Sequence, residues 1–305
     1  MKITVIIPTY NPDPKRLEQA LSALKQQSLP TSLWELLIID NNSSNNFHNQ
    51  LDLSWHPSFR IITEKRQGLT YARVSGFEES KGEFIVMVDD DNLLGMNYLR
   101  DVSHIFAHHP LMGSIGGRSL PLFESVPPEW LNEFYRALAL RDIGDKSIVD
   151  IWHGTYPEAA PIGAGMAIRK TALIPYINLI RSALNPITDR TATSLTSGGD
   201  NEINIELLKA GWQVGYFPEL ILQHMIPKER MQPEYLARLV HDTNKSWMVL
   251  LNKHGINPWD RINITTLFLR RAKAYLSCQA WKNDVNFIKW RAACGIFEGL
   301  TAAEY

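Results

Sequence analysis

Residues 83–99 read EFIVMVDDDNLLGMNYL and combine two contrasting patterns. The apolar run within residues 83–88 is typical of a strand buried on both faces, and Asp89–Asp91 follow it directly. Neighbouring carboxylates repel one another, and partial burial strengthens that repulsion. A single aspartate would be enough to cap a helix, so three in a row indicate a bound cation or a ligand that carries one. From Leu94 onward the apolar spacing predicts a helix.

Similar apolar runs lie upstream of this stretch and predict further strands. They are Ile3–Ile7, Glu35–Ile39 and Arg60–Thr63, with helical spacing over residues 17–24 and 69–82. Strands and helices that alternate over about 90 residues predict an α/β layer with a Rossmann-like sheet. Because ligands collect at the carboxyl ends of the strands in such sheets, residues 8–10, Asp40 and Asp89–Asp91 should line one crevice.

The rest of the chain is less regular. Strands are predicted at residues 115–117 and 164–168 and as a pair between residues 212 and 224, and helices at residues 127–141, 203–210 and from Pro233 onward. These patterns place a mainly helical region after about residue 230.

The totals narrow the classes of function. The chain has 305 residues, of which 45% are hydrophobic and 21% charged, as in folded globular proteins. A formal net charge of −1 gives no general basic surface, so nucleic acid is not an expected partner. Cys278 and Cys294 lack metal-ligand spacing, and a reducing cytoplasm is the simplest setting for them. The N-terminal apolar run is too short for a signal peptide, and no stretch approaches the ~20 apolar residues of a membrane span.

Two common phosphate-binding motifs are missing. No GxGxxG follows the first predicted strand, which argues against a dinucleotide-binding dehydrogenase, and there is no Walker loop. A metal ion could hold a diphosphate instead, because Mg²⁺ and Mn²⁺ take oxygen ligands from carboxylates and from substrate phosphates. Asp89 and Asp91 would point the same way in an extended chain, which is the spacing of a DxD motif.

Five segments in order resemble the family 2 glycosyltransferases. They read VIIPTYN, LLIIDNNSSN, RQGLTYARVSGFEESKGEFIVMVDDDN, PIGAGMAIRK and SGGDNEINIELLKAGWQVGYFPELILQH, and together they span about residues 3–230. The resemblance implies an α/β protein of the GT-A fold, with a Rossmann-like mixed sheet flanked by helices and a C-terminal helical extension. It places a catalytic domain at 1–230, divided near residue 115 into a nucleotide-binding half (about 1–115) and an acceptor-binding half (about 116–230), and the extension at 231–305.

The same resemblance implies an activity. It is the transfer, with inversion, of a sugar from a nucleotide-sugar, in the first instance a UDP-sugar, to a hydroxyl of a glycan or of a lipid-linked oligosaccharide in polysaccharide or glycoconjugate biosynthesis. The implied cofactor is a divalent metal, Mn²⁺ or Mg²⁺. Two other classes stay open. A non-catalytic nucleotide-sugar or glycan-binding protein would keep the DxD motif without a base, and a sugar nucleotidyltransferase would need a Gly-rich basic loop, which PTYNPDPKR does not supply.

The resemblance assigns nucleotide binding to residues near the ends of the first strands. They are Pro8, Thr9 and Tyr10 beside the base, Asp40 as an acceptor for base or ribose, Arg73 and Arg66 near the nucleotide or diphosphate, and Asp89 and Asp90. Asp89 would position the ribose or the waters of the metal, whereas Asp90 has no assigned role. Alternatives stay open for two of them, because Asp40 could cap the Asn-rich turn that follows and Arg73 could be a helix-surface arginine.

The metal and the catalytic base come from other segments. Asp91 would ligate the metal, and His224 would add a metal or diphosphate contact unless it is structural. Asp200 in SGGDNE would take the proton of the acceptor hydroxyl, with Glu202 as its acidic neighbour, although Asp200 could also be a helix N-cap. The backbone of residues 163–165 would approach the donor sugar or the acceptor, or else would only start a strand.

These last three residues are Gly163, Ala164 and Gly165, and Gly allows close approach because it lacks a Cβ.

Residues 258–300 mix tryptophans and aliphatic residues with Lys and Arg. Such a segment can lie on a membrane surface, which would suit a cytoplasmic protein held at the inner face of the cell membrane. The alternatives are a helical appendage that packs on the catalytic domain or a contact in a homodimer.

Overall fold

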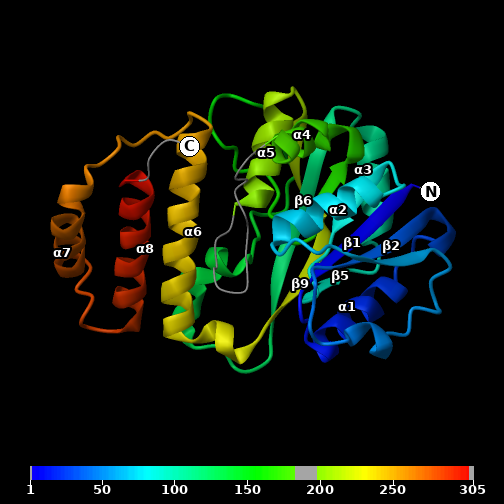
Figure 1. Ribbon diagram of the computed structural model, residues 1–305, viewed down its shortest axis with the longest axis horizontal. Coiled ribbons are helices and arrows are strands. Elements are labelled where there is room, and N and C mark those ends of the chain that lie inside the picture. Colours follow the sequence, from blue (N-terminus) through cyan, green and yellow to red (C-terminus); the bar gives the residue numbers. More distant parts are fainter. Residues whose placement is uncertain (1, 183–197, 302–305) are drawn as a thin grey trace. The chain divides into compact units, whose positions relative to one another are not determined.

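A computed structural model describes residues 2–182 and 198–301 of the chain (Figure 1). The described residues group into two compact units. The first contains residues 2–122, 139–182 and 199–225, and the second contains residues 123–138, 198 and 226–301. The sequence also predicts a polar, Gly-rich loop at residues 185–199, and most of this loop lies outside the described residues. The predicted domain boundaries near residues 115 and 230 stay predictions.

Helices and strands alternate along the first part of the chain. The strands are β1 (Ile3–Thr9), β2 (Trp34–Asp40), β3 (Phe59–Thr63), β4 (Phe84–Met87), β5 (Asn92–Leu94), β6 (Met112–Phe123), β7 (Ile148–Asp150), β8 (Ala167–Arg169) and β9 (Gln213–Ile226). The α-helices are α1 (Pro14–Lys25), α2 (Leu69–Glu79), α3 (Tyr98–His108), α4 (Ile174–Ser182), α5 (Gly199–Lys209), α6 (Pro233–Lys253), α7 (Leu267–Ser277) and α8 (Asp284–Thr301). Short 3₁₀-helices are η1 (Thr31–Leu33), η2 (Phe47–Gln50), η3 (Glu129–Leu138), η4 (Lys170–Leu173), η5 (Lys228–Met231) and η6 (Ile264–Thr266).

The strands in the described part of the chain form one mixed sheet in the order β3-β2-β1-β4-β8-β6-β9-β5, with β7 paired to β9. The pairs β1–β2, β1–β4 and β2–β3 are parallel, and Thr9 lies opposite Asp40 at the carboxyl ends of the first two. The pairs β4–β8, β6–β8, β5–β9 and β7–β9 are antiparallel. The predicted Rossmann-like mixed sheet with flanking helices is therefore confirmed.

Both faces of the parallel strands β1, β2 and β4 are covered, which explains their continuous apolar runs. Every residue of β1 and β2 is buried. Alternate residues contribute to two separate hydrophobic clusters, because side chains alternate across a strand. Ile3, Val5 and Ile7 pack in the cluster that includes residues of α1 and α3, whereas Ile6 packs in the one that includes residues of α2, α4 and α5.

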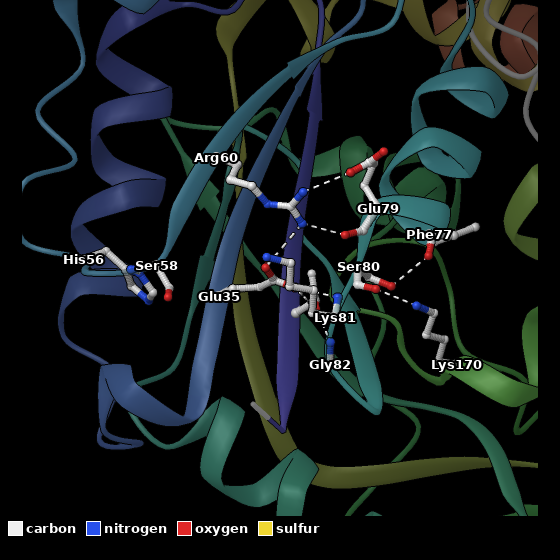
Figure 2. A network of polar contacts seen from close by, with 11 residues as sticks. Glu35, His56, Ser58, Arg60, Phe77, Glu79, Ser80, Lys81, Gly82 and Lys170 are labelled. Carbon is white, nitrogen blue, oxygen red and sulfur yellow. Dashed lines mark hydrogen bonds and ion pairs between the residues drawn. The ribbon is translucent and has the colours of Figure 1, made fainter.

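A buried network of hydrogen bonds connects the end of α2 to the amino ends of β1 and β2. Figure 2 shows this network. The carboxylate of Glu35 accepts hydrogen bonds from the Thr4 hydroxyl at 2.7 Å and from the backbone N–H of Lys81 at 2.6 Å. The guanidinium of Arg60 bridges Glu35 and the side chain and backbone carbonyl of Glu79. The network lies at the opposite ends of these strands from Thr9 and Asp40, so it holds α2 in place without entering the predicted crevice.

Several predicted elements need correction. The segment after Asp91 is not helical at first, because residues 92–94 form β5 and pair with residues 222–224 of β9; α3 begins only at Tyr98. The strand predicted at residues 164–168 begins at Ala167, because Gly165 has a positive φ of 73° and turns the chain. The helix predicted at residues 127–141 is the shorter 3₁₀-helix η3.

Two further corrections concern the segments around the predicted base. Helix α5 begins at Gly199, four residues before the predicted start. The predicted pair of strands between residues 212 and 224 is a single strand, β9, of 14 residues. Local pattern did not reveal its length, because β9 gains partners from β5 and β7, which lie far away in the sequence.

The second unit consists mainly of α6, α7, α8 and η3. Figure 1 shows α8 between α6 and α7. Helices α6 and α8 approach closely, because a β-carbon on Gly295 would overlap the backbone of His241 and one on Gly299 would overlap Met248. Met248, Leu251 and Leu300 form the hydrophobic cluster between these two helices.

Candidate active site

The carboxyl ends of β1 and β2 are joined by backbone and side-chain hydrogen bonds. The backbone N–H of Asn41 donates to the Thr9 carbonyl at 2.8 Å. The side-chain carbonyl of Asn41 accepts from the N–H of Gly68, and its amide donates to the backbone carbonyls of Glu64 and Arg66. Asn41 was not predicted as a site residue, although it directly follows Asp40. It holds the loop before α2 against the end of β2.

Asp40 is buried at the end of β2, where its carboxylate has two neighbours. Oδ1 accepts the backbone N–H of Ser43 at 2.9 Å, and Oδ2 lies 3.1 Å from Nε2 of His48. The first bond is the turn-capping role that the sequence left open for Asp40. A carboxylate offers about four acceptor positions, so the cap does not exclude a contact with a nucleoside. His48 is a neighbour that the sequence pattern did not predict.

Asp90, whose role the sequence did not indicate, has a partner on β1. Its Oδ2 accepts a hydrogen bond from the Thr9 hydroxyl. The middle aspartate of the triple therefore connects the loop after β4 to the end of β1. Thr9 itself was predicted to border the base, and its side-chain hydroxyl is used in this link.

Asp89 and Asp91 lie on either side of that link. The backbone N–H of Asp89 donates to the side-chain carbonyl of Asn92 at 3.3 Å, and the side-chain amide of Asn92 donates to Oδ1 of Asp91 at 3.0 Å. Nε2 of His224 lies 3.4 Å from the same Asp91 oxygen. The β5–β9 register explains this approach, since Asn92 lies opposite His224. The structure thus brings together the two residues that were predicted to bind metal.

The donor atoms of Asp91 and His224 fit a divalent cation of the Mn²⁺ type, which accepts both carboxylate oxygen and imidazole nitrogen. Within residues 2–182 and 198–301, no group of three or more His, Cys, Asp or Glu side chains could hold a metal ion by itself. Two protein ligands suit Mg²⁺ and Mn²⁺ in phosphate-transferring sites, where substrate phosphates and water complete the coordination. The residues present therefore fit a metal that is bound together with a diphosphate.

Arg73 and Asp200 approach each other at Gly163. A β-carbon on Gly163 would lie 3.0 Å from Nη2 of Arg73 and 3.3 Å from Oδ2 of Asp200. Arg73 is buried in α2, so the alternative of a helix-surface arginine is wrong. Gly163 lets both side chains lie against the backbone because it has no Cβ. An arginine from α2 and a carboxylate from α5 thereby meet at one turn.

Asp200 lies in the first turn of α5, one residue inside the helix. Its Oδ2 accepts the backbone N–H of Gly163 at 2.7 Å, and its Oδ1 accepts the N–H of Asn201 at 3.0 Å. A helix N-cap would instead accept from residues two or three positions further on. The side chain is therefore directed to the turn at Gly163 rather than used as a simple cap.

A network of neutral polar groups surrounds the start of α5. The hydroxyl of Tyr156 donates to the side-chain carbonyl of Asn201 at 2.7 Å and accepts from the amide of Asn204 at 3.0 Å. Asn204 also bonds the hydroxyl of Ser114 and the carbonyl of Pro161. Burial, with a smaller contribution from the charge of Asp200, raises the pKa of Tyr156, so the phenol stays neutral. Sequence reasoning missed these residues, although Asn201 and Asn204 share one helix face with the spacing i, i+3.

The turn of residues 163–166 joins the predicted base to the end of β4. The backbone N–H of Met87 donates to the Met166 carbonyl at 2.9 Å, and the carbonyl of Gly165 accepts from the Tyr98 hydroxyl at 2.6 Å. Burial raises the pKa of Tyr98, which keeps this donor protonated. Asp200 binds one end of the turn, at Gly163, and the aspartate triple begins two residues after Met87 at its other end.

The remaining predicted residues differ in their exposure. Tyr10 is 40% exposed, whereas Ala164 and Glu202 are buried, Glu202 completely. Arg66 forms a bidentate pair with Glu64, with both N–O distances 3.0 Å, and lies over the ring of Tyr71. The hydrogen bonds from Arg66 lower the pKa of the Glu64 carboxyl. The structure thus gives Arg66 partners in its own loop, and its role at a nucleotide stays a prediction, as do those of Pro8, Tyr10, Ala164 and Glu202.

A separate groove of about 440 Å³ lies between α1, the β5 region and β9. Its lining includes Gln19, Gln26, Met96, Leu120 and Gln223, and none of the predicted site residues contributes to it.

Among the described residues, no helix combines the length and the apolar character that crossing a membrane would require.

The chain belongs to the glycosyl transferase family 2, whose model matches residues 4–158. It is 27% identical over 144 residues to TarS of Staphylococcus aureus, a poly(ribitol-phosphate) beta-N-acetylglucosaminyltransferase, over 42% of this chain and 24% of that protein. It is 25% identical over 239 residues to an N-acetylglucosaminyltransferase of Sinorhizobium fredii, over 74% of this chain and 53% of that protein. The chain thus spans about a quarter to a half of the length of these curated relatives.

Solved structures of glycosyltransferases have the same fold. A mannosyltransferase of Pyrobaculum calidifontis in complex with GDP-Man and Mn²⁺ has a TM-score of 0.58 at 17% identity, covering 96% of this chain and 73% of that one. The crystal structure of TarS from S. aureus has a TM-score of 0.52 at 13% identity, covering 99% and 55%. At such identities the likeness shows the fold alone, and the predicted GT-A fold and family are confirmed.

Proposed function

We propose that this chain transfers a sugar, with inversion, from a nucleotide-sugar to a hydroxyl of a glycan or of a lipid-linked oligosaccharide. The observation that carries the proposal is the meeting of Asp200 and Arg73 at Gly163, at one end of a turn whose other end abuts β4 and its aspartates. The proposed base and Arg73 would then lie at one end of this four-residue turn, and the aspartates that follow β4 would lie near its other end. Membership of a family of sugar-transferring proteins supports the same function.

The proposed reaction is one in-line displacement. The acceptor oxygen forms a bond to the anomeric carbon while the bond from that carbon to the diphosphate oxygen breaks, and the configuration inverts. Asp200 takes the acceptor's proton as the new bond forms, because a neutral hydroxyl is a weak nucleophile. Two backbone N–H groups fix the orientation of the Asp200 carboxylate before an acceptor binds.

The diphosphate side is proposed to use Asp91, His224 and Arg73. Asp91 and His224 would hold a divalent metal, Mn²⁺ or Mg²⁺, and when bound this ion supplies positive charge that stabilises the departing diphosphate. The guanidinium of Arg73 adds a fixed positive charge near Gly163. Asp90 keeps the loop next to β1 through Thr9, while Asp40, Asp89 and Tyr10 would border the nucleoside.

The donor is proposed to be a UDP-sugar. A structure of TarS with UDP-GlcNAc has a TM-score of 0.53, and the mannosyltransferase of P. calidifontis holds GDP-Man, so donors of either base fit this fold. Thermal unfolding with Mn²⁺ and a panel of UDP-, GDP- and other nucleotide-sugars identifies the donor, since a ligand of the folded state raises the unfolding temperature.

A transfer assay with the stabilising donor then tests the activity. Release of nucleoside diphosphate together with a glycosylated acceptor supports the proposal. Stabilisation by the donor without turnover across a panel of glycan and lipid-linked acceptors would instead indicate a binding protein. Release of pyrophosphate from a nucleoside triphosphate and a sugar 1-phosphate would indicate a nucleotidyltransferase.

A further inference from the structure

Helix α7 lies at the margin of the second unit and buries none of its residues. Three large apolar side chains on it stand in solvent: Phe268 is 77% exposed, Leu269 68% and Leu276 65%. Exposed apolar surface of this extent within one short helix is unusual in a soluble protein, and it marks a surface that meets something else.

The exposed apolar side chains share one side of α7. At 3.6 residues per turn, Phe268, Leu269 and Leu276 fall within about a third of the helix circumference. Helix α7 contacts α8 through Arg271, which bonds Glu298, and through Tyr275, whose ring lies 5.2 Å from that of Trp290. Tyr275 comes seven residues after Phe268 and lies nearly in line with it along the helix, so the apolar side begins at the edge of this contact. Helix α8 therefore leaves Phe268, Leu269 and Leu276 largely uncovered.

Further exposed apolar residues lie at both ends of the helix. Ile264 of η6 is 68% exposed, and Trp281, just after the helix, is 59% exposed with its ring 5.7 Å from that of Tyr275. We call Ile264, Phe268, Leu269, Leu276 and Trp281 the α7 surface. Tryptophan combines a large apolar ring with a polar N–H, which suits the boundary between lipid tails and water.

Positive charge borders the α7 surface. Helix α7 contains Arg270, Arg271 and Lys273 and no acidic residue, and Lys282 follows Trp281. Arg271 is engaged by Glu298, but Arg270, Lys273 and Lys282 have no carboxylate partner among the residues that the structure describes. Long basic side chains beside an exposed apolar stripe can reach phosphate groups while their stems cover apolar surface.

We propose that the α7 surface binds the face of an anionic phospholipid bilayer, with its apolar side chains among the headgroups and upper acyl chains. An interfacial helix with an apolar side, basic flanks and a nearby tryptophan has this arrangement. A second copy of the chain is a poorer partner, because a two-fold contact would place two α7 helices side by side that contain Arg and Lys and no acidic residue. Charge complementarity thus favours a lipid surface.

Co-sedimentation of the full chain with vesicles tests this surface. The wild type should bind vesicles of phosphatidylcholine mixed with phosphatidylglycerol, bind pure phosphatidylcholine at least tenfold more weakly, and lose binding as salt rises. The variant Phe268→Ser/Leu276→Ser should lose at least tenfold in affinity for the anionic vesicles. Arg270→Gln/Lys273→Gln should lose the preference for anionic lipid.

Matched controls separate a surface effect from unfolding. Leu111→Ser removes a leucine that is 61% exposed on the first unit, and its vesicle binding should equal that of the wild type. All variants should keep the wild-type unfolding temperature, because the replaced side chains lie largely in solvent. Vesicle binding is measured without donor or acceptor, so the result is independent of the proposed activity.

Three outcomes would overturn the proposal. They are a wild type that does not bind anionic vesicles, a Phe268→Ser/Leu276→Ser variant that binds them as well as the wild type, and a concentration-dependent dimer that this variant converts to monomer in analytical ultracentrifugation. The last result would assign the α7 surface to a second copy of the chain.

Discussion

The Asp200 carboxylate and the backbone of Gly163 are joined by a hydrogen bond of 2.7 Å, in which the N–H of Gly163 donates to Oδ2. This bond connects the first turn of α5 to a turn that abuts the end of β4. It fixes the orientation of the carboxylate. Two of the roughly four acceptor positions of a carboxylate are then used by backbone N–H groups, which leaves room for an acceptor hydroxyl.

Replacing the proposed base should separate binding from transfer. We expect Asp200→Asn to lower the transfer rate by about 10²–10⁴-fold, because the amide cannot take a proton, while the donor affinity is unchanged. Rates are measured by released nucleoside diphosphate and affinity by calorimetry. Glu18→Gln, which neutralises an exposed carboxylate on α1, is the control and should leave both values as they are. Wild-type turnover by Asp200→Asn would assign the base elsewhere.

The metal assignment predicts a graded loss of Mn²⁺-dependent binding. Asp91→Ala should abolish the gain in nucleotide affinity that Mn²⁺ gives. Asn92→Ser should reduce that gain by about tenfold, because the Asn92 amide orients Asp91 through a bond of 3.0 Å. Calorimetric titrations with UDP in Mn²⁺ and in EDTA measure both effects. An unchanged Mn²⁺ dependence in Asp91→Ala would remove this residue from the metal site.

Two glycines of one turn should respond differently to alanine. Gly163→Ala places a methyl group 3.0 Å from Nη2 of Arg73 and should lower the transfer rate by displacing this side chain, with little change in unfolding temperature. Gly165→Ala should chiefly destabilise the fold, because Gly165 has a φ of 73° and its β-carbon would overlap Leu222. Thermal unfolding and the transfer assay are compared for both variants. Equal loss of stability in the two would contradict a special role of Gly163 at the site.

The buried network of Figure 2 predicts a stability difference between two glutamates that bind the same arginine. Glu35→Ala should lower the free energy of unfolding by about 2–3 kcal/mol, because it leaves Arg60 and the backbone N–H of Lys81 without their buried acceptor. Glu79→Ala removes a half-exposed ion pair and should cost less than about 1 kcal/mol. Chemical denaturation measures both values. Similar losses would mean that burial of Glu35 contributes little.

The second unit should lose stability in acid through Glu298. Burial opposes ionisation of this carboxyl, but hydrogen bonds from His241 and Lys245 outweigh it and lower the pKa of Glu298 below its ordinary value of 4.5. A carboxyl whose pKa is lower in the folded state stabilises the fold above its unfolded pKa, and that contribution is lost as the pH falls through the folded value. Denaturation of the wild type below pH 4.5 should therefore show a steeper decline than that of Glu298→Gln. Parallel pH profiles would contradict the assignment.

Much of the parallel half of the fold could be predicted from the sequence, and the physical reason is double-sided burial. Strands β1, β2 and β4 are fully buried and read as apolar runs. Strand β5 was missed because it has three residues and becomes a strand only by pairing with β9, more than a hundred residues later. Propensity within a short window contains no information about such a partner.

The candidate site shows the same division. Motif order pointed to Asp91, Asp200 and His224, and the structure places His224 beside Asp91 through the β5–β9 register. The hydrogen bond from Gly163 to Asp200 and the position of Tyr156 depend on the folding of distant loops, which no local pattern encodes. The turn-capping bond of Asp40 was foreseen only as an alternative.

The packing of η3 against α6 has a consequence for the design of truncated forms of this chain. Residues 123–138 belong to the same compact unit as the C-terminal helices, and η3 packs on α6 with Leu131, Phe134 and Leu138 buried. A truncation after residue 230 would remove α6 and expose these apolar side chains to solvent. The remaining fragment would then contain an apolar internal segment that favours aggregation. Expression of a minimal version of the protein therefore requires the C-terminal helices, even though the family motifs end before they begin.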